Sequence, residues 1–217
     1  PVFDWWAQAL ASRGYAVLEP EPRGSAGFGT RHYTASMKQW GLAMQDDITD
    51  GALQLVREGI VDKSRMCLFG GSYGGYASLQ GLVKDPELWR CASSYIAVTD
   101  LELLQTVSWS DTAQQSDYLD TDFKRRVGDY QRDRAQFDET SPARNAQKIK
   151  AAVMLTMGGN DKRVPLIHGT TMRDAMEKAG KPLDYHVYAD ESHGFTAPDN
   201  VTDFYARIER FFARHLK

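Results

Sequence analysis

The sequence lacks the features that would associate it with a membrane or with a nucleic acid. No apolar run approaches the roughly 20 residues that a membrane-spanning helix needs. The 26 lysine and arginine residues are outnumbered by 29 aspartate and glutamate residues, and they form no basic block. We therefore expect no nucleic-acid partner and no membrane-spanning segment within these 217 residues.

Cysteine is also scarce, because Cys67 and Cys91 are the only two in the chain. Each of them begins an apolar run that is typical of a buried strand, so we expect two buried free thiols. Neither a disulfide framework nor a metal site is indicated. We expect the protein to need no metal and no cofactor.

Internal repeats and low-complexity segments are missing as well, and 217 residues of which 42% are hydrophobic suffice for one domain with a sizeable core. Helical patterns alternate with short apolar runs, which is typical of an α/β fold: a mostly parallel sheet covered by helices on both faces. The polar stretch 99–148 is expected to form helices and loops over the site. We predict about five strands, at 15–18, 66–69, 91–98, 151–157 and 183–188, and helices at 3–13, 46–58, 77–83, 166–179 and 201–216.

A glycine-rich stretch, GGSYGGY at 70–76, lies between a predicted strand and a predicted helix. A Gly-x-Ser-x-Gly pattern at such a turn is typical of a nucleophile elbow. The turn raises the Ser72 hydroxyl above the edge of the sheet and directs the Tyr73 backbone N–H toward the position of an oxyanion. We expect that a Cβ atom at Gly70 or Gly74 would collide with the neighbouring segment. The alternative is a glycine-rich turn that merely carries a serine.

A serine hydroxyl becomes a good nucleophile only when a base takes its proton and an acid holds that base in the correct tautomer. In α/β hydrolases the order along the chain is serine, acid, histidine. Asp161 follows the predicted strand 151–157, and His193 follows the predicted strand 183–188. Open α/β sheets bind ligands at the carboxyl ends of their strands. The sequence therefore predicts a catalytic triad of Ser72, Asp161 and His193.

Two of the three residues have simpler interpretations when each is taken alone. Asp161 could be a turn aspartate beside glycines, and His193 could be a histidine of a surface loop. Asp190 is a second candidate acid, but it is so close to His193 in sequence that we rank it below Asp161. The weaker candidates for the base are the remaining histidines, His32, His168, His186 and His215.

With these residues in place, the chain resembles the catalytic domain of the prolyl oligopeptidase family of serine peptidases, which includes dipeptidyl aminopeptidases and acylaminoacyl peptidases. The resemblance extends over nearly the whole chain, and its motifs are specific in combination rather than singly. Besides the elbow, the matching segments are ASRGYAV at 11–17, PRGS at 22–25, GFG at 27–29, WG at 40–41, MQDDITDG at 44–51, NDKRVP at 160–165 and HGF at 193–195.

The resemblance implies an α/β-hydrolase fold that cleaves short peptides through an acyl-enzyme. In such a reaction Ser72 attacks the scissile carbonyl, and His193 first accepts and then donates the proton. Asp161 orients His193 and stabilises its charged form. The Tyr73 backbone N–H supplies one oxyanion donor.

The resemblance also suggests residues that bind the substrate. Arg163 matches an arginine that binds a substrate backbone carbonyl in some family members; alternatively, it is a surface arginine that pairs with a nearby acid. Tyr95, Trp109 and Tyr118 are candidates for the pocket that holds the residue before the cleaved bond, although such aromatics are more often part of a core.

Two features of the family are not found in this sequence. Members carry a His-Gly-Gly-Pro-like turn that supplies the second oxyanion donor, and an N-terminal β-propeller that restricts entry to small peptides. The first strands of the hydrolase sheet are not found either. We therefore expect residues 1–217 to be one catalytic domain, the C-terminal part of a longer peptidase whose upstream propeller is its partner. The compartment, the preferred residue at the cleavage site and any homo-oligomer are left open.

Two other functions are compatible with these motifs. A carboxylesterase can use the same fold, elbow and triad, because a fold does not determine the substrate. A non-catalytic interaction module could also keep the fold. The triad argues against that last function, because packing alone does not require Asp161 and His193 at their positions.

Overall fold

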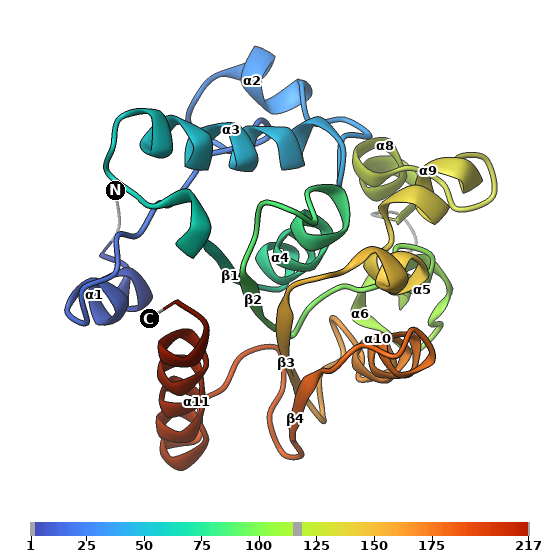
Figure 1. The fold of residues 1–217 in the computed structure, drawn as a ribbon. Coiled ribbons are helices and arrows are strands. Elements are labelled where there is room, and N and C mark those ends of the chain that lie inside the picture. The colour runs from blue at the N-terminus through green and yellow to red at the C-terminus, as the bar shows by residue number, and fades with distance from the viewer. Residues whose placement is uncertain (1–2, 115–118, 217) are drawn as a thin grey trace.

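The computed structural model describes residues 3–114 and 119–216. Its centre is a parallel sheet of four strands in the order β1-β2-β3-β4, with helices on both faces (Figure 1). Each connection between neighbouring strands passes through at least one helix, as parallel strands require. The predicted α/β fold is therefore confirmed. The strands are β1 (Cys67–Gly71), β2 (Cys91–Tyr95), β3 (Ala152–Gly158) and β4 (Asp184–Tyr188).

Different helices bury the two faces of the sheet, because successive side chains of a strand point in opposite directions. On one face Leu68 and Leu155 join a core to which α4 and α10 contribute. On the other face Met154 packs with Phe204 and Phe212 of α11, and Trp6 of α1 stacks against the same helix. The longer helices of the described chain are α3 (Ala43–Arg57), α4 (Tyr73–Lys84), α10 (Ile167–Lys178) and α11 (Pro198–Leu216), and α1 (Trp5–Ala11) is a shorter one.

Short helices make up most of the rest; α5, α6, α8 and α9 gather on the side of α4 and α10, and α2 lies next to α3 (Figure 1). Within the described ranges, no helix combines the length and the apolar character needed to cross a membrane. The short elements are α2 (Thr30–Thr34), η1 (Lys63–Arg65), α5 (Leu103–Thr106), α6 (Asp111–Gln114), η2 (Leu119–Phe123), α8 (Lys124–Val127), α9 (Arg134–Thr140) and η3 (Pro142–Lys148).

The predicted strand at 15–18 is wrong, because these residues belong to no strand in the described part of the chain. Val17 and Leu18 are 39% and 40% exposed. Residues of this segment and all of β1 line an apolar groove of about 1100 Å³, and within the described residues β1 pairs only with β2. A strand needs a partner for its backbone N–H and C=O groups. The apolar pattern of residues 15–18 therefore does not produce a strand in the described structure.

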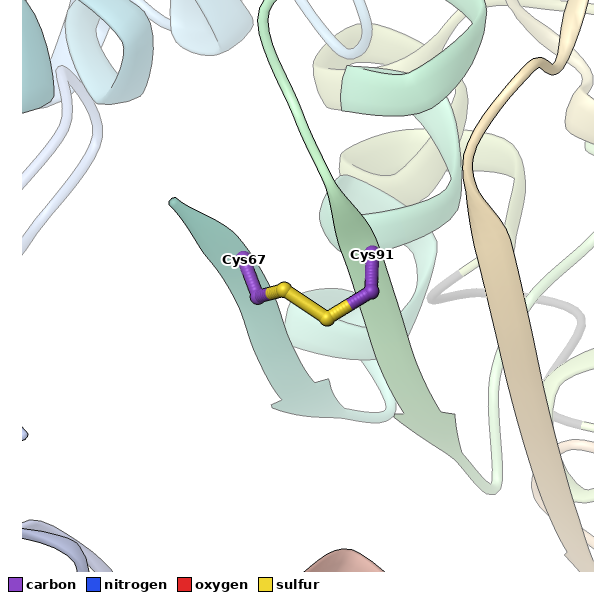
Figure 2. The surroundings of a disulfide bond; sticks show 2 residues. All are labelled: Cys67 and Cys91. Carbon is purple, nitrogen blue, oxygen red and sulfur yellow. A yellow bond between two sulfur atoms is a disulfide. The ribbon is translucent and has the colours of Figure 1, made fainter. Parts of the chain in front are cut away.

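The expectation of two free thiols is also wrong, because Cys67 and Cys91 form a disulfide (Figure 2). Both cysteines begin their strands, and the parallel register of β1 and β2 places them opposite each other. Their Cα atoms are 4.7 Å apart, within the range that a disulfide spans. The pairing depends on this register, which the apolar character of the two segments does not reveal.

We expect that replacing both cysteines by alanine lowers the free energy of unfolding by about 3 kcal/mol, because the disulfide closes a chain segment of 24 residues that contains all of α4. Urea unfolding of the wild type and the variant measures the difference. A reductant should lower the stability of the wild type to that of the variant and leave the variant unchanged. Equal midpoints for the oxidised wild type and the variant would contradict this expectation.

Candidate active site

Ser72 lies at the sharp turn between β1 and α4. Its backbone has φ 55° and ψ −117°, a conformation that residues with a side chain seldom adopt. Two hydrogen bonds hold the turn: Ser72 N–H donates to the Tyr95 carbonyl of β2, and Tyr76 N–H donates to the Ser72 carbonyl. The strained serine is thus fixed between the sheet and the first turn of the helix, as a nucleophile elbow requires.

The glycines around Ser72 make this turn possible, although not all in the way that the sequence predicts. A Cβ atom at Gly70 would lie 2.5 Å from backbone atoms of Gly74, and one at Gly71 would lie 2.3 Å from the Tyr95 ring. A Cβ at Gly75 would meet the Ala97 side chain at 2.7 Å. The expected collision at Gly74 is wrong, since a Cβ there meets no atom of another described segment within 4 Å.

The structure brings the three predicted triad residues together from three different strand ends. His193 Nε2 lies 2.9 Å from Ser72 Oγ, and His193 Nδ1 lies 2.8 Å from Asp161 Oδ2. Ser72 follows β1, Asp161 follows β3, and His193 follows β4, all at the carboxyl edge of the sheet. A chain of hydrogen bonds from carboxylate to imidazole to hydroxyl can pass the serine proton to the imidazole.

Asp161 is held from its other side by the backbone. Its Oδ1 accepts the N–H groups of Arg163 at 2.8 Å and Val164 at 2.9 Å, while Oδ2 faces His193. The residue is 1% exposed, so water contributes little to holding it. These two N–H donors determine which carboxylate oxygen faces the imidazole. They also offset the free-energy cost of burying a carboxylate away from water.

Tyr73 is the first residue of α4, directly after Ser72. The first N–H groups of a helix have no partner within the helix, and they lie at the positive end of its dipole. The Tyr73 side chain packs against Trp40 and Tyr76, and burial raises the pKa of its phenol, with the charge of Asp47 adding to the effect. The phenol stays neutral at ordinary pH, so what this residue offers the site is its backbone N–H.

A cavity of about 520 Å³ opens beside Asp161 and His193. Trp109 and Arg163 line it, and the Trp109 side chain is 54% exposed. Asp111 is a lining residue that the sequence did not single out; its N–H donates to the Lys162 carbonyl and so ties α6 to the loop of the acid. No spacing signal could have found it, because only the tertiary fold brings residues 111 and 162 together.

Of the other two predicted substrate-binding aromatics, only Tyr95 lies within the described residues, and it does not line this cavity. Tyr95 packs among Phe69, Phe195 and Phe204 and lines the apolar groove along β1. Tyr118 lies outside the described residues. Of the three aromatics, Trp109 is therefore the one that the described structure brings next to the triad.

The rival acid and the other histidines lie elsewhere. Asp190 is exposed, and Asp161 rather than Asp190 is hydrogen-bonded to the imidazole. His168 is fully buried, with Nδ1 3.3 Å from the Thr99 N–H. Within the described residues, no cluster of three or more histidine, cysteine or acidic side chains is arranged to hold a metal ion.

His168 makes the free energy of unfolding depend on pH, because burial lowers its pKa from 6.5 to about 4. The negative charges of Asp100 and Asp161 raise this pKa, but the effect of burial is larger. Below pH 6.5 the unfolded chain binds a proton that the folded chain rejects, so stability is lost as the pH falls toward 4. We expect this residue to remove about 3 kcal/mol over that range. Urea unfolding at pH 7 and pH 4 should show a correspondingly smaller loss for His168→Asn than for the wild type. Equal losses in the two proteins would show that His168 is not the cause.

Known proteins are similar to this chain over nearly its whole length. The model of the prolyl oligopeptidase family matches residues 1–217. Dipeptidyl aminopeptidase BIII of Pseudoxanthomonas mexicana is 35% identical over 214 residues, which cover 96% of this chain and 30% of that protein. Dipeptidyl peptidase family member 6 of Caenorhabditis elegans is 32% identical over 211 residues, which cover 95% of this chain and 28% of that protein.

Solved structures show the same catalytic fold. The uncomplexed acylaminoacyl peptidase of Pyrococcus horikoshii matches 99% of this chain and 35% of its own, with a TM-score of 0.88 and 26% identity. A puromycin-hydrolyzing peptidase of Mycobacterium tuberculosis matches 90% of this chain and 29% of its own, with a TM-score of 0.82 and 26% identity. The chain thus spans about a third or less of the length of these proteins. A family match over all 217 residues means that this chain belongs to the prolyl oligopeptidase family.

Proposed function

We propose that this chain is the catalytic domain of a serine peptidase that hydrolyses short peptides through an acyl-enzyme on Ser72. The observation that carries the proposal is the hydrogen-bonded row of Ser72, His193 and Asp161, with 2.9 Å and 2.8 Å between successive partners. Its members come from three separate loops, and the packing of those loops does not itself require a serine, a histidine and an aspartate in contact. The family of the chain supports the same reaction class.

The proposed reaction follows from the arrangement of these atoms. His193 Nε2 takes the proton of Ser72 as Oγ attacks the scissile carbonyl carbon. The carbonyl oxygen becomes an oxyanion, and the Tyr73 N–H donates a hydrogen bond to it. His193 then gives the proton to the leaving amine, and the acyl group stays on Ser72 until a water molecule, activated by the same imidazole, releases it. Asp161 keeps the Nδ1 proton in place throughout.

The lining of the 520 Å³ cavity supports a peptide as the substrate. The Arg163 side chain is exposed at its wall and carries donors for a backbone carbonyl oxygen. Trp109 offers an apolar surface for a substrate side chain. We propose these two residues for binding the segment before the cleaved bond. Tyr95 and Tyr118 stay predictions with less support.

We further propose that residues 1–217 are one domain of a longer peptidase with an upstream β-propeller, as the family resemblance implies. The chain spans only 30% and 28% of the length of the two curated relatives. The rest of those relatives is long enough to hold a further domain. The apolar groove along β1 supports a larger sheet, because an extended segment seated there could pair with the open edge of β1.

A carboxylesterase is the alternative that uses the same triad, and substrate comparison separates the two. We would measure kcat/KM for an aminoacyl-prolyl anilide, an acetyl-aminoacyl anilide and a nitrophenyl ester, with Ser72→Ala as the blank. Turnover of either anilide above the blank supports a peptidase. Turnover of the ester alone would assign the chain to the esterases. An interaction module would turn over none of the three.

A further inference from the structure

The loop that carries His193 is closed by a buried carboxylate. Glu191 is 3% exposed, and it lies two residues before the histidine. Its Oε2 accepts the Thr196 N–H at 2.9 Å, and its Oε1 accepts the Ala197 N–H and the Asn200 amide, each at 2.9 Å. These bonds join the start of the loop to the residues just before α11 and in its first turn. They close the backbone segment that carries His193 into a short loop.

Hydrogen bonds, rather than an ion pair, offset the free-energy cost of burying the Glu191 carboxylate in the described structure. None of the ion pairs among the described residues includes Glu191, although a buried charge is costly without compensation. Burial raises the pKa of Glu191, but the donors on Asn200, Thr196 and Ala197 outweigh it and leave the pKa below its ordinary value. The carboxylate is therefore charged at neutral pH, and its position at the start of α11 suits a negative charge.

The same residue also joins the loop of the base to the loop of the acid. The Glu191 carbonyl accepts the Asn160 N–H at 2.9 Å, one residue before Asp161. The two loops touch along their backbones, since a Cβ at Gly158 would lie 2.4 Å from the Ser192 carbonyl oxygen. A shift of Glu191 is thus transmitted both to the loop of His193 and to the loop of Asp161.

We propose that Glu191 is a positioning residue of the catalytic site: its carboxylate holds the loop of His193 in the place where Nε2 reaches Ser72. The proposal rests on the proposed function, because it assigns to Glu191 the geometry of that reaction. Phe195, which packs against Tyr188 and Phe204, holds the other side of the same loop. The loop therefore has one polar anchor and one apolar anchor around the base.

Glu191→Gln tests this role with almost no change of shape. Both oxygens of Glu191 face donors, so the new NH₂ group meets a donor in either orientation, and the loop must move. A displacement of about 1 Å can cost about 100-fold in rate. We expect kcat to fall between about 10-fold and 100-fold while KM changes less than about 3-fold. Asp190→Asn removes the exposed neighbouring charge and should change neither constant.

A spectroscopic measurement on the same proteins does not depend on activity. The proton between His193 Nδ1 and Asp161 gives a downfield resonance, because it lies in a charge-assisted hydrogen bond. We expect this signal in the wild type and in Asp190→Asn, and its loss or fast exchange with water in Glu191→Gln. A wild type that shows the signal but turns over no substrate would count against the proposed function and not against the role of Glu191.

The outcomes separate positioning from mere support of the fold. A folded Glu191→Gln protein with kcat within about 3-fold of the wild type and an unchanged signal would overturn the proposal. Where that variant does not fold, Asn200→Ala removes only one of the donors to Glu191. It should lower kcat several-fold with little change in melting temperature, and an unchanged kcat and Nδ1 signal would overturn the proposal equally.

Discussion

Asp161→Asn should lower kcat by about 10⁴-fold while the protein stays folded. The reason lies in the two backbone N–H groups that Oδ1 accepts, from Arg163 and Val164. They force the amide oxygen of the new asparagine to face them, so its NH₂ group must face His193 Nδ1. The imidazole then carries its proton on Nε2, where it cannot accept the proton of Ser72.

The measurement is kcat for an anilide substrate, with the melting temperature recorded on the same samples. Asp190→Asn is the matched control, because it makes the same change in an exposed acid of the neighbouring loop. It should keep full activity. An Asp161→Asn protein that retains more than about a tenth of the wild-type kcat would contradict the assignment of the acid.

Gly70→Ala and Gly74→Ala should have opposite effects on stability, although both change the elbow by one methyl group. At Gly70 the Cβ lies 2.5 Å from the backbone of Gly74, and neither segment can yield without moving Ser72. We expect a loss of about 3 kcal/mol and a fall in kcat of about 100-fold. At Gly74 the space is open within the described structure, and alanine favours a helix over glycine by up to about 1 kcal/mol.

Urea unfolding compares the stability of the two variants, and the rate at which a fluorophosphonate labels Ser72 reports on the position of the serine. Gly74→Ala should unfold at an equal or higher urea concentration than the wild type, and Gly70→Ala at a much lower one. Two variants with equal midpoints would mean that the strand-to-helix turn is looser than its contacts indicate.

The sequence was sufficient to predict that Ser72, Asp161 and His193 lie in contact, because each of them follows a strand. Short apolar runs end a few residues before Ser72, Asp161 and His193 and so place these residues at the same edge of a parallel sheet, and the order along the chain then selects them. The same logic gives the α/β fold, whose pattern of alternating strands and helices is local. Both predictions rest on features within a few residues of the motif.

The wrong predictions all depend on contacts between distant segments. Residues 15–18 have the apolar pattern of a strand, yet in the described part of the chain they join no strand and line the groove along β1 instead. Cys67 and Cys91 pair because two strands happen to align them. The crowding at Gly71 comes from the Tyr95 ring of another strand, and no segment of the described structure comes close enough to crowd a Cβ at Gly74. None of these features can be predicted from the residues next to it in the sequence.

The most direct test of the account is covalent labelling by a fluorophosphonate, followed by mass spectrometry of the peptides. The account predicts one label, on Ser72, that is absent in Ser72→Ala and strongly slowed in His193→Ala, because the imidazole 2.9 Å away activates the hydroxyl. A label that persists in Ser72→Ala, or one that forms on Ser72 equally fast without His193, would contradict it.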